Sequence, residues 1–217
     1  WALGHKSIRV LSSQCLDAIS PSNTRSDVRS EMTAGFPYQL HHASVVADLL
    51  SRLIRPPLAK KGLITDLVDT LWSAIVDEVG VEGISWSLER NSHTHALYQQ
   101  QLRTLAGAGA FVAVASKNDP DVVQQAFRRS DLFLDANEMF PVEVSWGLKS
   151  EAVRRILQAW NVGPDSVVFV DDSPMELAEV QSAFPEIECL PFPKNDPQAC
   201  LELFDQLRDL FGKNAIS

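Results

Sequence analysis

Residues 62–72 read GLITDLVDTLW, an apolar run that ends in a polar turn beginning at Asp66. A short apolar run of this kind is typical of a strand buried on both faces of a parallel sheet. Asp66 would then stand at the carboxyl end of that strand, with Thr70 in the turn behind it. Open α/β sheets bind their ligands at the carboxyl ends of the strands, so we expect the chemistry of this protein to begin at Asp66.

From Leu58 onward, short apolar runs alternate with amphipathic segments. Strands are predicted at GLITDL (62–67), FVAVA (111–115), DLFL (131–134), SVVFV (166–170) and IECL (187–190). Helices are predicted over 95–106, 120–129, 149–160, 175–183 and 197–211. Strands and helices that alternate in this way form parallel βαβ units, which indicates an α/β fold with a Rossmann-like parallel sheet flanked by helices. Single βα units account for most of the chain between the motifs, so no large cap domain is expected.

The chain is expected to divide near Pro56 and Pro57 into two parts. Residues 1–56 are interpreted as an N-terminal appendage or the end of a preceding domain, and residues 57–217 as a catalytic-type domain. Within the appendage, residues 7–13 have strand character and residues 43–54 have helical apolar spacing. A chain that begins with Trp1 is expected to be part of a longer protein.

Composition excludes several classes of function. With 217 residues, 45% hydrophobic and 22% charged, the chain has an ordinary globular composition, and no apolar run approaches the roughly 20 residues that span a bilayer. The net charge of −9 disfavours nucleic-acid binding, which needs a basic face. Three cysteines without metal-like spacing favour a reducing, cytoplasmic location. We therefore expect neither a membrane nor a nucleic-acid partner.

Polar side chains follow three of the apolar runs, and a lysine begins a helix between them. Asp66 could attack phosphorus, because a carboxylate is ionised at neutral pH and forms an acyl phosphate. Ser116 and the amides after it could bind phosphoryl oxygens, and Lys149 would stabilise the charge of the transition state. Asp66 with Asp172 forms a minimal ligand set for Mg²⁺, to which Glu176 could add a bound water.

Each of these residues also has a structural interpretation. An aspartate or serine after an apolar run is more often a helix cap or turn former, and the histidines near residue 93, His93 and His95, are interpreted as solvated or capping. Four motifs in the right order favour the catalytic interpretation. The segment from Ser73 to Ser87 is the expected flap over the site.

These four motifs resemble those of the haloacid dehalogenase (HAD) superfamily of phosphotransferases. The blocks GLITDLVDTLW, HALYQQQLRTLAGAGAFVAVASKNDP, WGLKSEAVRRIL and DSVVFVDDSPMELAEV, with GFPYQLHHASVVADLLSRLIRPP upstream, resemble its FkbH-like branch. The resemblance implies an enzyme that takes a glyceryl-type three-carbon unit from 1,3-bisphosphoglycerate, dephosphorylates it and loads it onto an acyl carrier protein in polyketide-type biosynthesis.

The resemblance also implies a role for each site residue. Asp66 is the nucleophile, and Ser116 and Lys149 bind phosphate. Substrate-binding residues and metal ligands follow the same motifs: Thr70, Lys117 and Asn118 for the substrate, and Asp66, Asp171, Asp172 and the main-chain carbonyl of Val68 for Mg²⁺.

Val68 departs from the superfamily pattern Asp-x-Asp-x-Thr, in which the second aspartate donates and accepts the reaction proton. Ordinary phosphomonoester hydrolysis should suffer, whereas Mg²⁺ binding through the carbonyl of Val68 should survive. Two interpretations stay open. The domain is either an enzyme acting on an acyl phosphate, whose leaving group needs little protonation, or a catalytically degenerate domain that docks a carrier protein or joins neighbouring domains of a megasynthase. Ala115 stands where the branch often has a cysteine, which leaves Cys15 as a weak thioester candidate.

Overall fold

The computed structural model describes residues 13–54, 58–74 and 79–212. The chain divides into two compact units between Leu58 and Ala59. We call them the N-terminal unit and the sheet unit, and each is described by itself.

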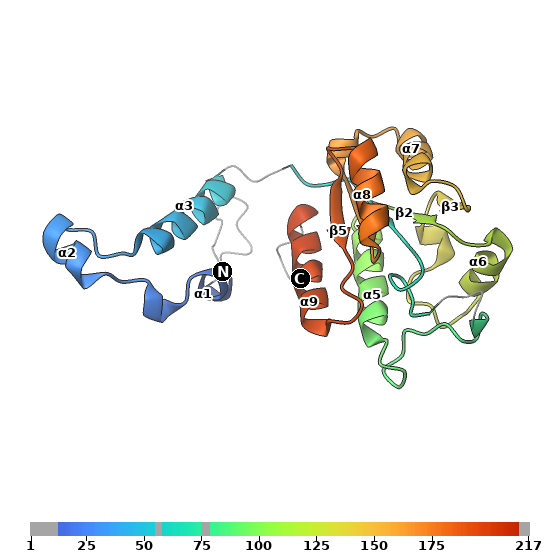
Figure 1. Ribbon diagram of the computed structural model, residues 1–217, viewed down its shortest axis with the longest axis horizontal. Coiled ribbons are helices and arrows are strands. Elements are labelled where there is room, and N and C mark those ends of the chain that lie inside the picture. The colour runs from blue at the N-terminus through green and yellow to red at the C-terminus, as the bar shows by residue number, and fades with distance from the viewer. Residues whose placement is uncertain (1–12, 55–57, 75–78, 213–217) are drawn as a thin grey trace. The chain divides into compact units, whose positions relative to one another are not determined.

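The N-terminal unit is helical (Figure 1). Its elements are α1 (Ser13–Ile19), the 3-10 turn η2 (Ser22–Thr24), α2 (Val28–Ala34) and α3 (Leu40–Ile54). Its described buried side chains are few: Ser20, His42 and Val45, with Ser20 Oγ 3.0 Å from His42 Nδ1. Most of the strand predicted over residues 7–13 lies outside the described residues, and Ser13 itself begins α1.

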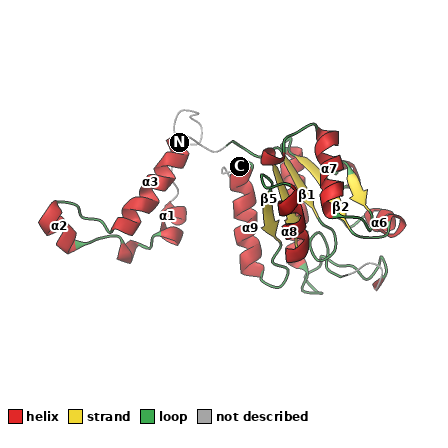
Figure 2. Ribbon diagram, turned by 45° about the horizontal axis from the view of Figure 1, so that its top comes forward, coloured by secondary structure: helices red, strands yellow, loops and turns green. Residues whose placement is uncertain are grey.

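The sheet unit holds five parallel strands in the order β3-β2-β1-β4-β5 (Figure 2). The strands are β1 (Gly62–Thr65), β2 (Phe111–Ser116), β3 (Val142–Val144), β4 (Val167–Asp171) and β5 (Glu188–Pro191). The helices are α5 (His93–Gly107), α6 (Pro120–Phe127), α7 (Lys149–Trp160), α8 (Pro174–Ala183) and α9 (Pro197–Leu210), with short 3-10 turns η3 (Ala136–Glu138) and η4 (Pro164–Ser166). The predicted Rossmann-like sheet flanked by helices is confirmed.

Successive strand residues pack into two separate hydrophobic cores, one on each face of the sheet. Leu63 and Val168 pack with residues of α5, α6 and α9 on one face of the sheet, and Ile64 and Phe169 pack with α7 and α8 on the other. Successive strand side chains point to opposite faces, so the continuous apolar runs fill both cores. The three central strands are therefore buried on both sides.

The strand order reverses between β1 and β4. From β1 the chain moves to β2 and β3 on one side, then returns through α7 to β4 and β5 on the other side of β1. Such a switch point opens a crevice between the loops at the carboxyl ends of the two central strands, where α/β proteins bind ligands. Asp66 follows β1, and Asp171 ends β4, so both stand at this point.

One predicted strand is wrong. Residues 131–134 (DLFL) form turns, and the third strand is Val142–Val144. Leu134 is fully buried, so the apolar character of the run reflects its packing into the core rather than a strand. The backbone N–H of Phe133 donates to Gln99 Oε1 of α5 at 3.1 Å instead of joining the sheet. A three-residue edge strand is too short to show a period in the sequence.

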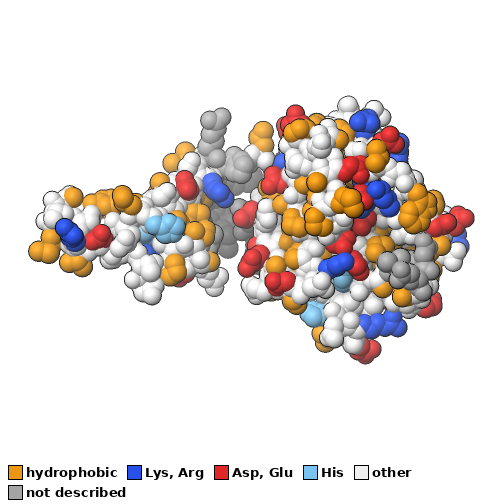
Figure 3. All heavy atoms as spheres, in the orientation of Figure 1, with side chains coloured by type: hydrophobic (Ala, Val, Ile, Leu, Met, Phe, Trp, Pro, Cys, Tyr) orange, Lys and Arg blue, Asp and Glu red, His pale blue; other side chains and the backbone are white. Residues whose placement is uncertain are grey.

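No large cap domain is evident among the described residues. Within the predicted flap, Ser73 pairs with Ser85 in an antiparallel bridge, while residues 75–78 lie outside the described part. No helix among the described residues is long and apolar enough to cross a membrane. Acidic and basic side chains are interspersed over the visible face of the sheet unit (Figure 3).

Candidate active site

A buried lysine joins the ends of the two central strands. Lys149, the first residue of α7, is only 4% exposed. Its Nζ lies 2.9 Å from Asp66 Oδ1 and donates a hydrogen bond to Asp171 Oδ2. The backbone N–H of Asp66 donates to the carbonyl of Val170 at 3.0 Å, which fixes the two aspartates side by side. One buried cation thus serves two buried carboxylates.

Burial dominates the electrostatics of this group. It raises the pKa of Asp66, against the lowering effect of Lys149. Burial, together with the nearby charge of Asp66, raises the pKa of Asp171 to about 6. Burial opposes the charge of Lys149, but the two carboxylates outweigh it and raise the pKa of the ammonium. Removing groups from water disfavours their charged forms, and an opposite charge nearby restores them.

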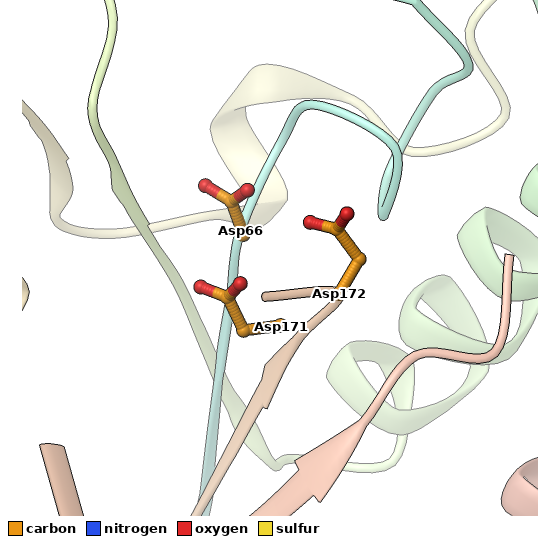
Figure 4. Close-up of side chains that lie close together, drawn as sticks. All are labelled: Asp66, Asp171 and Asp172. Atoms are coloured by element: carbon orange, nitrogen blue, oxygen red, sulfur yellow. The ribbon is translucent and has the colours of Figure 1, made fainter. Parts of the chain in front are cut away.

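Three carboxylates could hold a metal ion at this place (Figure 4). Asp66, Asp171 and Asp172 each offer one oxygen, and these atoms lie within 4.8 Å of one another. We call these three residues the carboxylate cluster. Hard cations such as Mg²⁺ prefer oxygen ligands. Asp66 Oδ1 is buried, and its contact with Lys149 has the distance of an ion pair without the geometry of a hydrogen bond. The donor set and this unfilled oxygen fit Mg²⁺.

A small cavity of about 180 Å³ lies over the carboxylate cluster. It is lined by Asp66, Val68, Lys117, Lys149, Asp171, Asp172, Ser173 and Glu176. The lining includes every predicted metal ligand and two of the three predicted catalytic residues, Asp66 and Lys149, but not Ser116. Its chemistry is that of a site for an anion bound beside a cation.

Ser116 lies at the end of β2 and is buried. It lies close enough to Asp66 to lower the pKa of that carboxyl, yet its Oγ has no partner of full hydrogen-bond geometry among the described residues. A buried hydroxyl without a partner costs free energy unless something binds it. Ser116 is therefore available for a ligand oxygen.

The three predicted substrate-binding residues have different surroundings. Lys117 lines the cavity and donates to Glu176 Oε1 at 2.9 Å. Asn118 is buried and accepts from the backbone N–H of Asp119, just before α6, and Thr70 is fully buried with its Oγ1 unpartnered. Neither Thr70 nor Asn118 lines the cavity. The hydroxyl of Thr70 does not tie the turn after Asp66; backbone bonds to the carbonyl of Leu67 do so.

Val68 lines the cavity, but the aspartate that follows it is occupied elsewhere. Asp69 Oδ1 accepts from the backbone N–H of Ala74 at 3.0 Å, and its Oδ2 accepts from Lys194 Nζ at 2.7 Å. The bonds from Lys194 and Ala74 outweigh the effect of burial and hold the pKa of Asp69 below its usual range. Asp69 is therefore not free to serve as the proton carrier that the resemblance leads one to expect at position 68.

Sequence reasoning missed Lys194. It lies between β5 and α9, and its Nζ also donates to Asp172 Oδ2 at 2.8 Å. A lysine just past the carboxyl end of a fifth parallel strand was the available signal, but β5 lies two places from β1 in the sheet.

His95, interpreted from the sequence as solvated or capping, is not solvated. His95 is 4% exposed, its Nδ1 lies 2.9 Å from the carbonyl of Thr70, and its ring stacks on Phe192. It packs the loop after β1 against α5. His95 thus supports the site without facing solvent.

Neither cysteine with a described side chain is a ready nucleophile. Burial raises the pKa of Cys189 and of Cys200 to about 11. At neutral pH both are thiols, and the thiolate is the reactive form. The side chain of Cys15 lies outside the described part of the structure.

Comparison with known proteins defines the fold. No family model and no curated protein matches the sequence. The crystal structure of the N-terminal part of BF1531 from Bacteroides fragilis, containing a phosphatase domain complexed with Mg, is similar over 99% of this chain and 58% of that one, with a TM-score of 0.79 and 23% identity. The chain thus spans under two thirds of that neighbour.

Two further solved structures resemble it more remotely. The HAD family enzyme bt-2542 from Bacteroides thetaiotaomicron, in a magnesium complex, has a TM-score of 0.45 and 13% identity over 67% of this chain and 99% of that one. A HAD-superfamily hydrolase from Ehrlichia chaffeensis has a TM-score of 0.44 and 13% identity over 70% and 99%. The likeness to the BF1531 fragment carries the conclusion: this chain shares the α/β fold of that fragment.

Proposed function

We propose that this protein is an FkbH-like domain that transfers a phosphoryl group from an acyl phosphate to Asp66 with the help of Mg²⁺. Its substrate is a phosphorylated three-carbon metabolite such as 1,3-bisphosphoglycerate, and its partner is an acyl carrier protein that receives the glyceryl-type unit. The magnesium-bound phosphatase domain of the BF1531 fragment supports the metal, and the block resemblance supports the substrate.

One observation carries the proposal. A buried ammonium and two buried carboxylates line one small cavity, those of Lys149, Asp66 and Asp171. The buried, unpartnered hydroxyl of Ser116 lies beside Asp66. Burying these groups is unfavourable unless they are paired, and Ser116 Oγ and Asp66 Oδ1 are still without hydrogen bonds. A bound phosphoryl group would give both atoms a partner, since the hydroxyl of Ser116 can donate to its oxygens and the carboxylate of Asp66 can attack its phosphorus.

The reacting bond favours an acyl phosphate as the substrate. A carboxylate oxygen of Asp66 attacks phosphorus, the bond from phosphorus to the acyl oxygen breaks, and the acyl group leaves as a carboxylate anion. This leaving group is stable without a proton, so the step tolerates Val68. Water then attacks the phosphorus of phospho-Asp66, which releases inorganic phosphate and restores the carboxylate. Lys149 stays protonated, because both neighbouring carboxylates raise its pKa, and it stabilises the growing negative charge.

Loading of the carrier protein is a separate step. It uses an acyl phosphate that Asp66 has not cleaved: the phosphopantetheine thiolate attacks its acyl carbon, the bond from that carbon to the phosphate oxygen breaks, and the phosphate leaves as inorganic phosphate. The two cysteines with described side chains have raised pKa values, so a direct attack by the carrier thiol fits better than transfer through either of them. Mg²⁺, held by the carboxylate cluster with the carbonyl of Val68, would neutralise the charge that accumulates between phosphate and Asp66.

A second candidate function follows from Val68 and Asp69. The proton carrier of the superfamily is absent at Val68, and Asp69 is bound by Ala74 and Lys194. A domain without this group could serve only to dock a carrier protein or to connect neighbouring domains of a megasynthase. This interpretation requires binding without turnover.

Mass spectrometry separates the two functions. We would incubate the protein with Mg²⁺, 1,3-bisphosphoglycerate and a phosphopantetheinylated carrier protein, and follow the carrier mass and phosphate release. The catalytic proposal expects a glyceryl-type mass gain of the carrier and, in samples without carrier, phosphate release faster than in buffer, which Asp66→Asn should lose. Asp121→Asn, an exposed aspartate in the first turn of α6, is the matched control and should behave as the natural protein. Carrier binding with unchanged carrier mass and background phosphate release would support the docking function instead.

A further inference from the structure

Lys194 joins three loops at the active edge of the sheet. Its Nζ donates to Asp69 Oδ2 at 2.7 Å and to Asp172 Oδ2 at 2.8 Å. Asp69 belongs to the loop after β1, Asp172 to the loop after β4, and Lys194 to the segment after β5. Asp172 is also a member of the carboxylate cluster, so the lysine touches a candidate metal ligand directly.

The position of Lys194 is built into the fold. The backbone N–H of Lys194 donates to the carbonyl of Phe192 at 3.0 Å in a tight turn. Phe192 is buried, and its ring stacks on His95 and lies against Tyr98, both of α5. Asp69 is held from the other side by the N–H of Ala74. Both ends of the contact are therefore fixed by other parts of the sheet unit.

The carboxylates of the cluster are paired with two different lysines. Lys149 serves the buried pair Asp66 and Asp171, and Lys194 serves Asp172 and Asp69. Lys149 is buried beneath the cavity, whereas the side chain of Lys194 is 37% exposed. A cation that enters from solvent therefore finds Asp172 already paired with Lys194.

We propose that Lys194 is a built-in counter-ion of the metal site, which occupies Asp172 and Asp69 and competes with the divalent cation for Asp172. The inference rests on the metal site of the proposed function. Its consequence is that the site binds Mg²⁺ more weakly than its carboxylates alone would. Metal loading is then linked to release of Lys194 from the loops after β1 and β4.

The effect has a definite sign and size. An ammonium about 5 Å from a divalent ion repels it by enough, in a water-like dielectric with physiological screening, to weaken binding by about fivefold. Lys194→Gln should therefore tighten Mg²⁺ binding by about fivefold. Lys194→Arg keeps the charge and should bind Mg²⁺ within about twofold of the natural protein, which separates charge from loop packing.

Isothermal titration of the whole chain with MgCl₂ tests this. Lys60→Gln is the matched control, because Lys60 also lies near a carboxylate, Glu188 at 3.7 Å, but precedes β1 at the opposite edge of the sheet. Tighter binding in Lys194→Gln, with no such change in Lys194→Arg or Lys60→Gln, supports the inference. Measurable binding in Lys194→Gln alone supports it equally when the natural protein binds too weakly to measure. Unchanged or weaker binding in Lys194→Gln, or tighter binding in Lys194→Arg as well, overturns it.

The outcomes also separate the inference from the proposed function. Mg²⁺ binding by the natural protein with no change in Lys194→Gln rejects the counter-ion alone. No binding in any variant rejects the metal site and the counter-ion together.

A second measurement needs no variant. Acetylation of the natural protein with a water-soluble amine reagent, read by mass spectrometry, reports the accessibility of Lys194. Mg²⁺ should raise the labelling of Lys194 severalfold while that of Lys60 stays constant. Equal labelling of Lys194 with and without saturating Mg²⁺ would contradict the competition.

Discussion

Replacing Lys149 by methionine should destabilise the sheet unit in a way that depends on pH. The substitution keeps most of the side-chain volume but leaves Asp66 and Asp171 without their buried cation. Removing one partner of a buried ion pair costs about 3 to 5 kcal/mol, because an uncompensated charge stays buried. We expect a loss of this size at pH 8 in the presence of a chelator.

Protonation limits the loss at lower pH. In the natural protein, the pKa of Asp171 is about 6 against 3.8 for a free side chain, so this group's contribution to stability is fully present below pH 3.8 and is lost as the pH rises through 6. Without Lys149, the pKa values of Asp171 and Asp66 rise further. The folded variant then holds about one more proton than the unfolded chain between pH 5 and 8. Its free energy of unfolding therefore falls by about 1.4 kcal/mol for each pH unit of increase.

Urea unfolding followed by tryptophan fluorescence measures this effect. Four of the five tryptophans lie in the sheet unit, Trp72, Trp86, Trp146 and Trp160, so most of the signal reports on this unit. The gap in unfolding free energy between the natural protein and Lys149→Met should widen from pH 5 to pH 8. The double variant with Asp171→Asn should recover most of it. A constant gap over this range, or no gap at pH 8, would refute the account of Lys149 as the cation that keeps two buried carboxylates ionised.

Three further outcomes are expected. Val68→Asp should raise Mg²⁺-dependent hydrolysis of simple phosphomonoesters by roughly 10² to 10⁴, because it restores a proton donor; Val68→Asn is the control, and equal activity in both would contradict this. Asp172→Ala should abolish Mg²⁺ binding in calorimetry, and undiminished binding would remove Asp172 from the metal site. Gly62→Ala should lower the free energy of unfolding by about 1 to 3 kcal/mol, since the new Cβ would lie 2.4 Å from Trp160 Cζ3; an unchanged urea midpoint would show that Trp160 can move freely.

Local patterns in the sequence were sufficient for most of the fold. The helix predicted over residues 149–160 matches α7, and the apolar runs at 62–67, 111–115, 166–170 and 187–190 correspond to four of the five strands. The first three of these runs form the central strands, which are buried on both faces, so they are continuous and easy to recognise. The run at 131–134 misleads in the same way, because Leu134 is as buried as a strand residue but lies in a bend outside the sheet.

The sequence by itself determined which residues stand at the carboxyl ends of the central strands, because strand ends and polar residues are local features of the chain. Asp66, Ser116 and Asp171 could therefore be named before the structure. Only the tertiary structure decided which lysine pairs with which carboxylate around this site. Lys194 lies 125 residues from Asp69 along the chain, yet its ammonium contacts that carboxylate and Asp172. Such a contact depends on the strand order β1-β4-β5 and on the packing of Phe192 against α5. Neither feature can be predicted from local sequence, because both join residues that are far apart along the chain.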